Sequence, residues 1–244
     1  MGLQQIQDTV PRPSAAIPCG LCPAAPCSVC RALPATAAAE LGQWASRTTV
    51  DAATRLPPVQ DDDMRILTDG IVRVEIKLDD GRRQITQFRY AGDALPADTT
   101  DVGTRRRMVA VTSCTLCRIP NQAFDDVALR HPAVRGCRRA LAAAEAEGLA
   151  RQVAVVGRLT AAERLALFLH EVATRTGRPT SGGGVAFQLP MTREDIADHL
   201  GLNVETVSRN LTRLKGAGLL RLPKPSSAIV PDMAALDAAA PHVG

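Results

Sequence analysis

The sequence predicts an α+β protein with an N-terminal antiparallel β-barrel, a long helix and a C-terminal winged helix-turn-helix. Short stretches of alternating apolar and polar residues fill much of 61–120, and turn signals separate them. Apolar residues then recur at spacings of three and four after Pro132, and two capped helices meet at a glycine late in the chain. The 244 residues are 45% apolar and 22% charged, which suits one large or two ordinary domains and excludes a disordered chain.

Two features of the composition are unusual. Aromatic residues make up only 2% of the chain, so base stacking on single-stranded nucleic acid has few side chains to use. Seven cysteines are present, and four of them fall within residues 19–30. No apolar run reaches about 18 residues, and the N-terminus lacks a secretory pattern, so we expect no membrane contact and a cytoplasmic location. Thiols stay reduced there, which favours metal or redox chemistry over structural disulfides.

We expect four regions along the chain. The first is a cysteine-rich arm without lasting periodicity, and the second opens with a short helix at residues 35–46. The predicted regions are the arm at 1–34, the β-barrel sensor domain at 35–131, the dimerisation helix at 132–157 and the DNA-binding domain at 158–244.

Three strand-like stretches support the barrel. Residues 71–78 alternate apolar and polar side chains, the turn at 79–81 contains glycine, and residues 84–90 alternate again, as in a β-hairpin. Residues 107–117 form a third strand-like run before Pro120.

The helix at 132–157 carries one heptad-like seam, which predicts pairing with a second copy of the chain. The alternative is that the seam packs on its own domain. Pairing through this seam should be weak, because alanine and glycine bury little surface and two Arg151 side chains would approach each other. The seam residues are Val134, Cys137, Leu141, Ala144, Gly148, Arg151 and Val155.

The late segment has the local signals of a helix-turn-helix. A capping box at Thr160 starts one helix, and Thr192 caps the next, with His199 expected on its solvent side. Gly201 supplies the turn, and Asn203 caps the second helix of the motif. This second helix is expected to bury Val204, Val207, Leu211 and Leu214.

The outer face of this second helix has the side chains that read DNA. Arginine reads guanine with two hydrogen bonds, glutamate accepts from cytosine, and serine or threonine holds phosphate. Residues 219–222 and 228–230 are expected to pair as a wing. The predicted DNA-contacting residues are Glu205, Ser208, Arg209, Thr212 and Arg213.

Residues 189–209 resemble the DNA-binding segment of the CRP/FNR family of bacterial transcription regulators. The core Glu205-x-x-Ser208-Arg209 is similar to the base-reading set of the FNR and FixK branches. This resemblance implies a jelly-roll barrel of the cyclic-nucleotide-binding type, homodimers, binding to a palindrome of TTGAT-type half-sites in double-stranded DNA, and contact with RNA polymerase. We find no nucleophile–base constellation, so we expect no enzyme activity.

The signal that the barrel senses must be inferred from its own residues. The glutamate and the arginine–hydroxyl pair of the cyclic-nucleotide binders are missing after Gly92-Asp93 and at 105–108, which argues against such a ligand. Four cysteine thiolates can instead hold a 4Fe-4S cluster. The spacing of Cys19, Cys22 and Cys30 resembles the N-terminal ligand set of oxygen-sensing FnrL-type proteins, and Cys117 resembles their internal ligand.

Other interpretations of the cysteines remain open. Cys27 competes with Cys30 as the third ligand, and two cysteine pairs can also hold zinc. A dithiol switch through Cys114 and Cys117, nitric oxide sensing through haem, or no cofactor are alternatives, and Cys114 and Cys137 are otherwise buried hydrophobes. A different class is a metal-storing or redox protein whose helix-turn-helix only packs.

Overall fold

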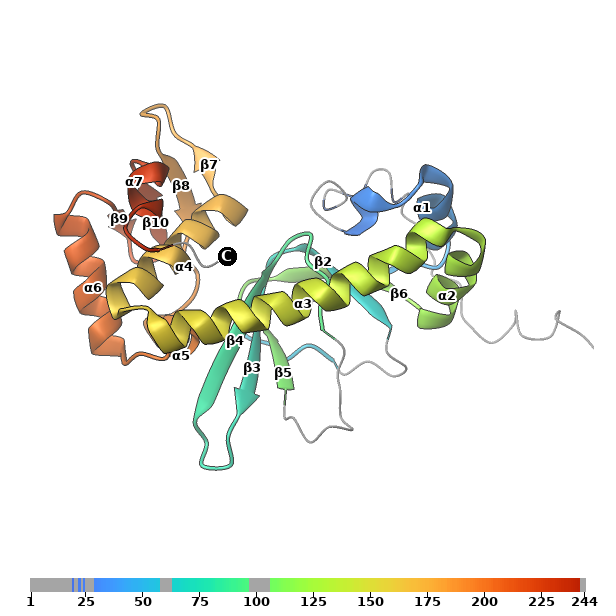
Figure 1. Cartoon of the computed structure of the whole chain (residues 1–244), viewed down its shortest axis with the longest axis horizontal. Coiled ribbons are helices and arrows are strands. Elements are labelled where there is room, and N and C mark those ends of the chain that lie inside the picture. The colour runs from blue at the N-terminus through green and yellow to red at the C-terminus, as the bar shows by residue number, and fades with distance from the viewer. Residues whose placement is uncertain are drawn as a thin grey trace, which may run out of the picture.

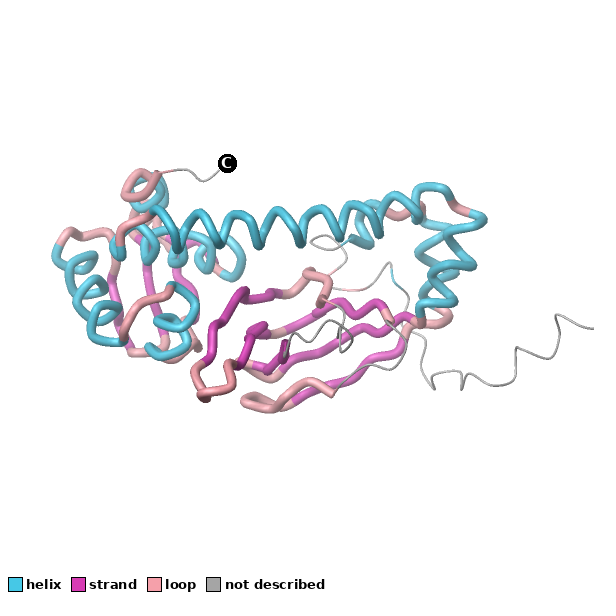
Figure 2. The backbone as a smooth tube through the Cα atoms, turned by 60° about the horizontal axis from the view of Figure 1, so that its bottom comes forward, coloured by secondary structure: helices cyan, strands magenta, loops and turns pink. Residues whose placement is uncertain are grey.

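The computed structural model describes residue 19, residue 22, residue 24 and residues 29–57, 63–96 and 106–241. Two small β-sheets form the middle of the molecule, and the helix α3 (Pro132–Arg158) passes over them to reach the C-terminal half (Figure 1). Figure 2 shows this helix extending along the whole length between the two ends of the protein. None of the described helices is long and apolar enough to cross a membrane.

The sheets of the N-terminal half are both antiparallel and three-stranded, with strand orders β1-β6-β2 and β4-β3-β5. Their strands share one apolar core, which includes Leu67 of β2 and Val74 of β3. The described strands form two jelly-roll-like sheets and do not close into the predicted barrel. The strands are β1 (Ser46–Val50), β2 (Met64–Asp69), β3 (Ile71–Lys77), β4 (Arg83–Tyr90), β5 (Arg106–Ala110) and β6 (Cys114–Ile119).

Three short helical elements gather at the N-terminal end of α3. A second core lies among them, and it includes Leu41, Phe124 and Val134. The predicted helix at 35–46 is shorter than expected, because the chain turns after Gly42 and enters β1 at Ser46. The elements are the 3-10 helix η3 (Val29–Ala32), α1 (Ala35–Gly42) and α2 (Asn121–Arg130).

The C-terminal half contains four helices and a four-stranded sheet of order β7-β8-β10-β9. The predicted wing is the β9–β10 pair of this sheet. The core of this half extends onto Phe88 and Tyr90 of β4, so the outer face of the sheet packs against it. The elements are α4 (Ala161–Thr176), β7 (Arg178–Pro179), β8 (Val185–Gln188), α5 (Arg193–Leu200), α6 (Val204–Gly216), β9 (Arg221–Lys224), β10 (Ser227–Val230) and α7 (Met233–Asp237).

The hairpin predicted at 71–90 is confirmed as β3 and β4, which pair antiparallel around a turn containing Gly81. The single strand-like run predicted at 107–117 is wrong. It is two strands, β5 and β6, which belong to different sheets and are joined by a turn at 111–113. Alternation alone cannot separate two strands when the residues of the turn continue the same apolar–polar pattern.

Candidate functional site

The helix-turn-helix consists of α5 and α6, and its local geometry follows the sequence signals. The Thr192 hydroxyl accepts from the Asp195 amide, and the Asp195 carboxylate accepts in return from the Thr192 amide. Gly201 ends α5 in the left-handed region at φ 62°, where glycine carries no Cβ penalty. The Asn203 side chain accepts from the Thr206 amide and starts α6.

Helix α6 separates cleanly into a buried and an exposed face. Val207, Leu211 and Leu214 are buried as predicted. The expectation for Val204 is wrong, because its side chain is 39% exposed in the first turn of the helix. At this position the helix has only just left the Asn203 cap and has not yet reached the core.

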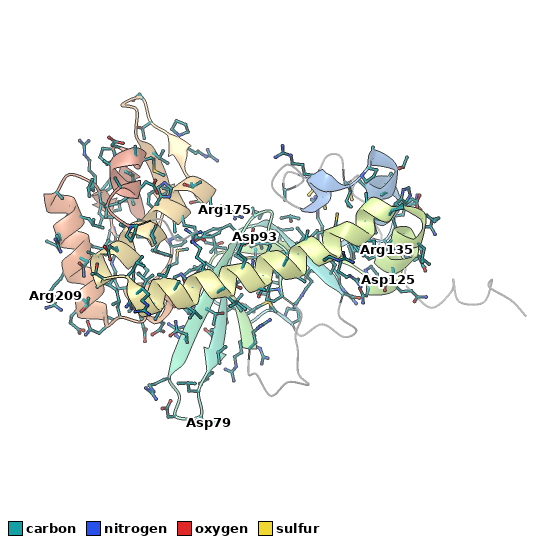
Figure 3. The ribbon with its side chains drawn as sticks, in the orientation of Figure 1. Asp79, Asp93, Asp125, Arg135, Arg175 and Arg209 are labelled. Atoms are coloured by element: carbon teal, nitrogen blue, oxygen red, sulfur yellow. The ribbon has the colours of Figure 1, made fainter. Side chains whose placement is uncertain are left out.

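All five residues predicted to contact DNA lie on the exposed face of α6. Figure 3 shows Arg209 on the outer side of this helix, pointing away from the rest of the protein. The Arg209 guanidinium donates to the Thr206 hydroxyl over 3.0 Å, and the Thr212 hydroxyl donates to the Ser208 carbonyl over 3.1 Å. These contacts lie within one helix, so the face is free to enter a major groove.

A charged network that was not predicted fixes α5 against the sheet. The Arg83 guanidinium of β4 lies 2.5 Å from Asp198 and 2.8 Å from Asp195. Arg73 of β3 lies 3.3 Å from Asp195, and Glu75 joins both arginines. The Asp195 side chain is only 4% exposed, and both guanidinium groups reach it, so loss of either would leave a buried carboxylate with one partner fewer.

The last carbonyl groups of α5 are also held from three different elements. Carbonyls at a helix end have no partner within the helix, so they need donors from elsewhere. Gln84 of β4 donates to the Asp198 carbonyl over 2.5 Å, Gln152 of α3 donates to the His199 carbonyl over 2.7 Å, and Arg164 of α4 donates to the Leu200 carbonyl over 2.9 Å. We call these contacts, with the charged network, the α5 junction.

His199 lies at the centre of the α5 junction, so its predicted solvent position is wrong. The residue is 7% exposed, and its Nδ1 is 3.1 Å from the Ile85 carbonyl. Its ring lies edge-on to Phe88, with 5.0 Å between centroids, and beside Phe168. Burial lowers the pKa of His199 to about 4, although the hydrogen bond to Ile85 opposes the shift, so the ring is neutral at pH 7.

The predicted cluster ligands come together at the other end of the molecule. Cys117 of β6 packs against the core at the N-terminal end of α3. Leu33, which follows the 3-10 helix containing Cys30, packs against the same core. Burial, followed by the charges of the neighbouring Cys19, Cys30 and Cys22, raises the pKa of Cys117 to about 12. These thiols therefore act on one another electrostatically.

The four thiols are not arranged around a single ion. In the part of the chain that the structure describes, no three His, Cys, Asp or Glu side chains form a group that could hold a metal ion. Cys27, the competitor for the third position, lies outside the described residues. A zinc ion needs its thiolates in a tight tetrahedron, whereas the several irons of a cluster hold their thiolates further apart. The choice between a cluster and zinc therefore depends on the spacing of the cysteines in the sequence and not on a metal geometry among the described residues.

The alternative dithiol switch is contradicted by the structure. Cys114 and Cys117 are three residues apart on one strand, so they point to opposite faces, about 10 Å apart along the backbone. Cys114 is buried in the core between the sheets, and Cys117 faces the helical end. A disulfide needs Cα atoms within about 7 Å. Cys114 and Cys137 are buried, as expected of small hydrophobes.

The seam predicted on α3 faces the protein itself along much of its length. Val134, Cys137 and Val155 are buried in their own chain. Gly148 faces Gln87 of β4, and Leu141 borders a cavity against the sheet. Ala144 and Arg151 are exposed at the edge of this face. The three-and-four spacing therefore marks the packing of α3 on the sheets, which was the alternative interpretation.

Comparison with known proteins gives the family. Residues 163–239 match the Crp-like helix-turn-helix domain. The nitrogen fixation regulation protein FixK of Azorhizobium caulinodans is 36% identical over 173 residues, which cover 70% of this chain and 68% of that protein. The chain belongs to the CRP/FNR family of transcription regulators. It is therefore a regulator with a DNA-binding domain and not an enzyme.

Further relatives cover two thirds or more of the chain. The transcriptional activator protein FnrL of Cereibacter sphaeroides is 32% identical over 174 residues, 68% of each chain. The structure of FixK2 from Bradyrhizobium japonicum is similar with a TM-score of 0.71 and 26% identity, over 82% of this chain and 99% of that one. The regulator TTHB099 of Thermus thermophilus shares the fold, with a TM-score of 0.64 and 22% identity over 79% and 96%.

One sequence signal for the α5 junction was overlooked. Asp195 and Asp198 are three residues apart and so share a helix face, and the hairpin after β3 carries the pair Arg82-Arg83. Opposite charges on the hairpin and on α5 do not require an ion pair, because charged side chains are more commonly exposed to solvent. The pairing therefore becomes visible only when the hairpin and α5 are placed in space.

Proposed function

We propose that this CRP/FNR regulator responds to oxygen or cellular redox state through a 4Fe-4S cluster bound by Cys19, Cys22, Cys30 and Cys117. The observation that carries the proposal is that Leu33 of the arm and Cys117 of β6 pack against one core, where Cys19, Cys30 and Cys22 lie near enough to raise the pKa of Cys117. The resemblance of the cysteine spacing to FnrL-type ligand sets supports it. When bound, such a cluster supplies iron that oxygen oxidises and a link between arm and sheet that is lost on oxidation.

The arm is well placed to influence the long helix. Its 3-10 helix η3 contacts α3, and Leu33, which follows η3, packs against the same core as Cys117 of β6. The far end of α3 contributes Gln152 to the α5 junction. The arm therefore supports one end of α3. The other end of α3 helps to position the helix-turn-helix of α5 and α6. We divide the chain accordingly into arm (1–34), sensor (35–131), dimer helix (132–157) and DNA-binding domain (158–244).

The proposed homodimer forms along the exposed face of α3. A stripe on this face repeats at spacings of three and four on the side opposite the buried residues. Four of its six members are alanine or glycine, which let two helices approach closely, and Val153 is 73% exposed. We call this stripe the dimer stripe; its residues are Arg139, Ala143, Ala146, Ala150, Val153 and Gly157.

The proposed DNA target is a palindrome of two TTGAT-type half-sites. In a dimer, the two α6 helices enter successive major grooves one helical turn apart. Arg209 and Glu205 read bases, and Ser208, Thr212 and Arg213 complete the contact face. RNA polymerase is the proposed protein partner, and a cytoplasmic location follows from the access to DNA that a regulator needs.

Anaerobic purification of the full chain tests the cluster. We expect a coloured protein with iron and sulfide in equal amounts, whose visible absorption fades in air while its affinity for the palindrome falls. The Cys30→Ser and Cys27→Ser variants form a matched pair, and only the variant that removes a ligand should be colourless. A colourless anaerobic protein, or one holding stoichiometric zinc, would overturn the proposal.

A further inference from the structure

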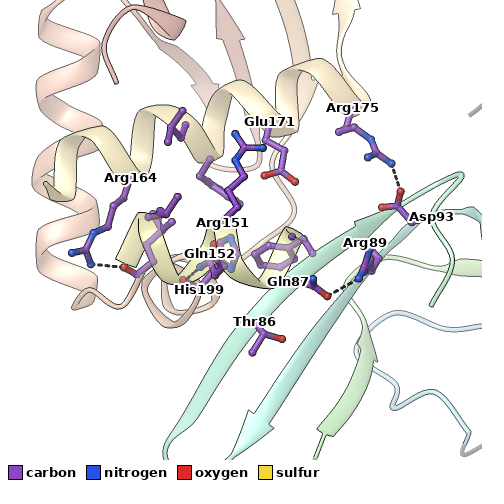
Figure 4. Close-up of a pocket in the computed structure, with 16 residues that line it drawn as sticks. Thr86, Gln87, Arg89, Asp93, Arg151, Gln152, Arg164, Glu171, Arg175 and His199 are labelled. Carbon is purple, nitrogen blue, oxygen red and sulfur yellow. Dashed lines mark hydrogen bonds and ion pairs between the residues drawn. The ribbon is translucent and has the colours of Figure 1, made fainter. Parts of the chain in front are cut away.

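A cavity of about 180 Å³ lies between the sheet and the DNA-binding half, beside the α5 junction (Figure 4). Its walls come from β4, α3, α4 and the end of α5. His199 and Leu200 of α5 line it together with Gln152 of α3 and Arg164 of α4. The residues that position the reading unit are therefore also walls of the cavity.

The charge of the lining is predominantly positive. Four arginines line the cavity against the carboxylates of Asp93 and Glu171, and His199 is neutral. Glu145 pairs with one of these arginines from outside, which still leaves one positive charge in excess. The lining arginines are Arg89, Arg151, Arg164 and Arg175.

The four guanidinium groups differ in how many hydrogen bonds and ion pairs they make with the described residues. Arg175 lies 2.5 Å from Asp93, and Arg164 donates to two backbone carbonyls. Arg151 has no hydrogen bond or ion pair with any residue that the structure describes; its interaction with Glu171 is electrostatic. Arg89 uses Nη2 for Gln87 and Glu145, but its Nε is buried without a partner among the described residues. Arg151 thus retains its hydrogen-bond donors at the cavity, and Arg89 keeps one buried donor without a partner among the described residues.

Two further features shape this space. A Cβ at position 148 would lie 3.3 Å from the Gln87 amide nitrogen, so glycine lets α3 pass close to β4 at the cavity. The remaining wall is apolar, with Phe88, Phe168 and Val155. The guanidinium of Arg89, whose Nε is buried without a partner among the described residues, adds positive charge to this wall. Ligand sites commonly combine an apolar wall with a few convergent polar groups.

We infer that this cavity binds a small organic anion with one carboxylate or phosphate group. The anionic group faces the Arg151 guanidinium, near the positive charge of Arg89, and the apolar part lies against the phenylalanine rings. Binding requires neither the cluster nor DNA, so it stands apart from the proposed function. Because the ligand contacts His199 and Gln152, its binding would also change how firmly α5 is held.

Calorimetric titration of the full-length, cluster-free protein tests this inference in the absence of DNA. The probes are benzoate and phenyl phosphate, with uncharged benzamide as the control ligand. We expect at least one of the two anions to bind and benzamide not to bind. Binding by benzamide of equal strength would contradict an anion site, and absence of binding by both anions would overturn the proposal.

Substitutions in the cavity lining then test whether the anion binds at this site. Arg151→Gln removes an exposed guanidinium, and Gly148→Leu fills the cavity; each should weaken anion binding by about tenfold or more. Arg82→Gln is the matched control, because it removes the same charge from the exposed hairpin. If Gly148→Leu does not fold, Arg151→Gln alone decides the test. Anion binding that survives Arg151→Gln unchanged would place the ligand elsewhere and refute this site.

Discussion

The Nε atom of Arg83 lies 2.5 Å from the Oδ2 atom of Asp198 and joins the sheet to the first helix of the DNA-reading unit. Desolvation disfavours the charge of Arg83, but the hydrogen bond to Asp198 and the charges of Asp195 and Glu75 outweigh it and raise the pKa of the guanidinium. A second guanidinium nitrogen reaches the buried Asp195. One arginine thus bridges two carboxylates of α5 and limits how this helix moves against the sheet.

Replacing Arg83 with glutamine should therefore destabilise the protein. The buried Asp195 keeps Arg73 but loses its shorter ion pair, and Asp198 loses the 2.5 Å contact. We expect the free energy of unfolding in urea to fall by about 2 kcal/mol. The control is Arg82→Gln at the neighbouring position, where the arginine side chain is 77% exposed and should contribute little. Equal losses in both variants would show that the bridge to α5 contributes nothing.

The buried His199 predicts a specific dependence of stability on pH. Its pKa is about 4 in the folded protein, against 6.5 for an ordinary histidine. Between these values the unfolded chain binds a proton that the folded protein does not, so stability falls as the pH is lowered through this window. The loss is about 3 kcal/mol and is complete below pH 4.

The His199→Asn variant isolates this contribution. An amide keeps a donor for the Ile85 carbonyl but does not titrate, so the loss between pH 6.5 and 4 should shrink by most of that amount. Carboxylates titrate in both proteins, and their effect cancels in the difference between the two urea unfolding curves. A variant that loses stability as steeply as the parent over this window would contradict a buried, neutral His199.

Local patterns account for the parts of the fold that the sequence predicts. The hairpin of β3 and β4 follows from alternation around Gly81, and α5 and α6 follow from caps and a left-handed glycine. The burial of His199 was not predicted, because the sequence of α5 does not show which element a polar side chain faces. His199 faces the Ile85 carbonyl on a strand far away in the sequence. Contacts between separate elements have no local period, so only the tertiary arrangement reveals them.

The sequence pattern of α3 indicates a packed face, but it was assigned to the wrong partner for a related reason. Apolar residues at spacings of three and four mark a packed face but do not say against what it packs. Val134 and Val155 mark the face that lies on the helix's own chain, whereas the alanines of the dimer stripe carry too little apolar surface to stand out. The cysteines were easier to group, since clustered thiols are rare enough that their spacing alone suggests a shared site.

The dimer stripe makes a prediction about association. Ala146 lies in the middle of the stripe and is exposed, so Ala146→Glu would bring two carboxylates together between the helices of a dimer. We expect the dissociation constant, measured by analytical ultracentrifugation, to rise by at least about tenfold. Ala140→Glu is the control, because this exposed residue of α3 lies outside the stripe. A larger rise in the dissociation constant for Ala140→Glu than for Ala146→Glu would show that the dimer interface lies on another face of α3.

The exposed position of Arg209 leads to a prediction about sequence recognition. If its guanidinium reads a guanine edge, Arg209→Ala should remove about 1–3 kcal/mol of discrimination between the TTGAT palindrome and a scrambled duplex. Its contact with Thr206 lies within α6 and on the surface, so the thermal unfolding temperature should stay unchanged. Fluorescence anisotropy with both duplexes at one fixed salt concentration measures this difference.

Lys215→Gln provides the comparison that separates reading from simple attraction. Lys215 is exposed on the same helix but lies off the row formed by Glu205, Arg209 and Thr212. Removing this charge should weaken both duplexes alike and leave the discrimination intact, because phosphate contacts carry no sequence information. If Arg209→Ala behaves in the same way as Lys215→Gln, Arg209 contacts the backbone only, and base reading must then fall to Glu205 and its neighbours on α6.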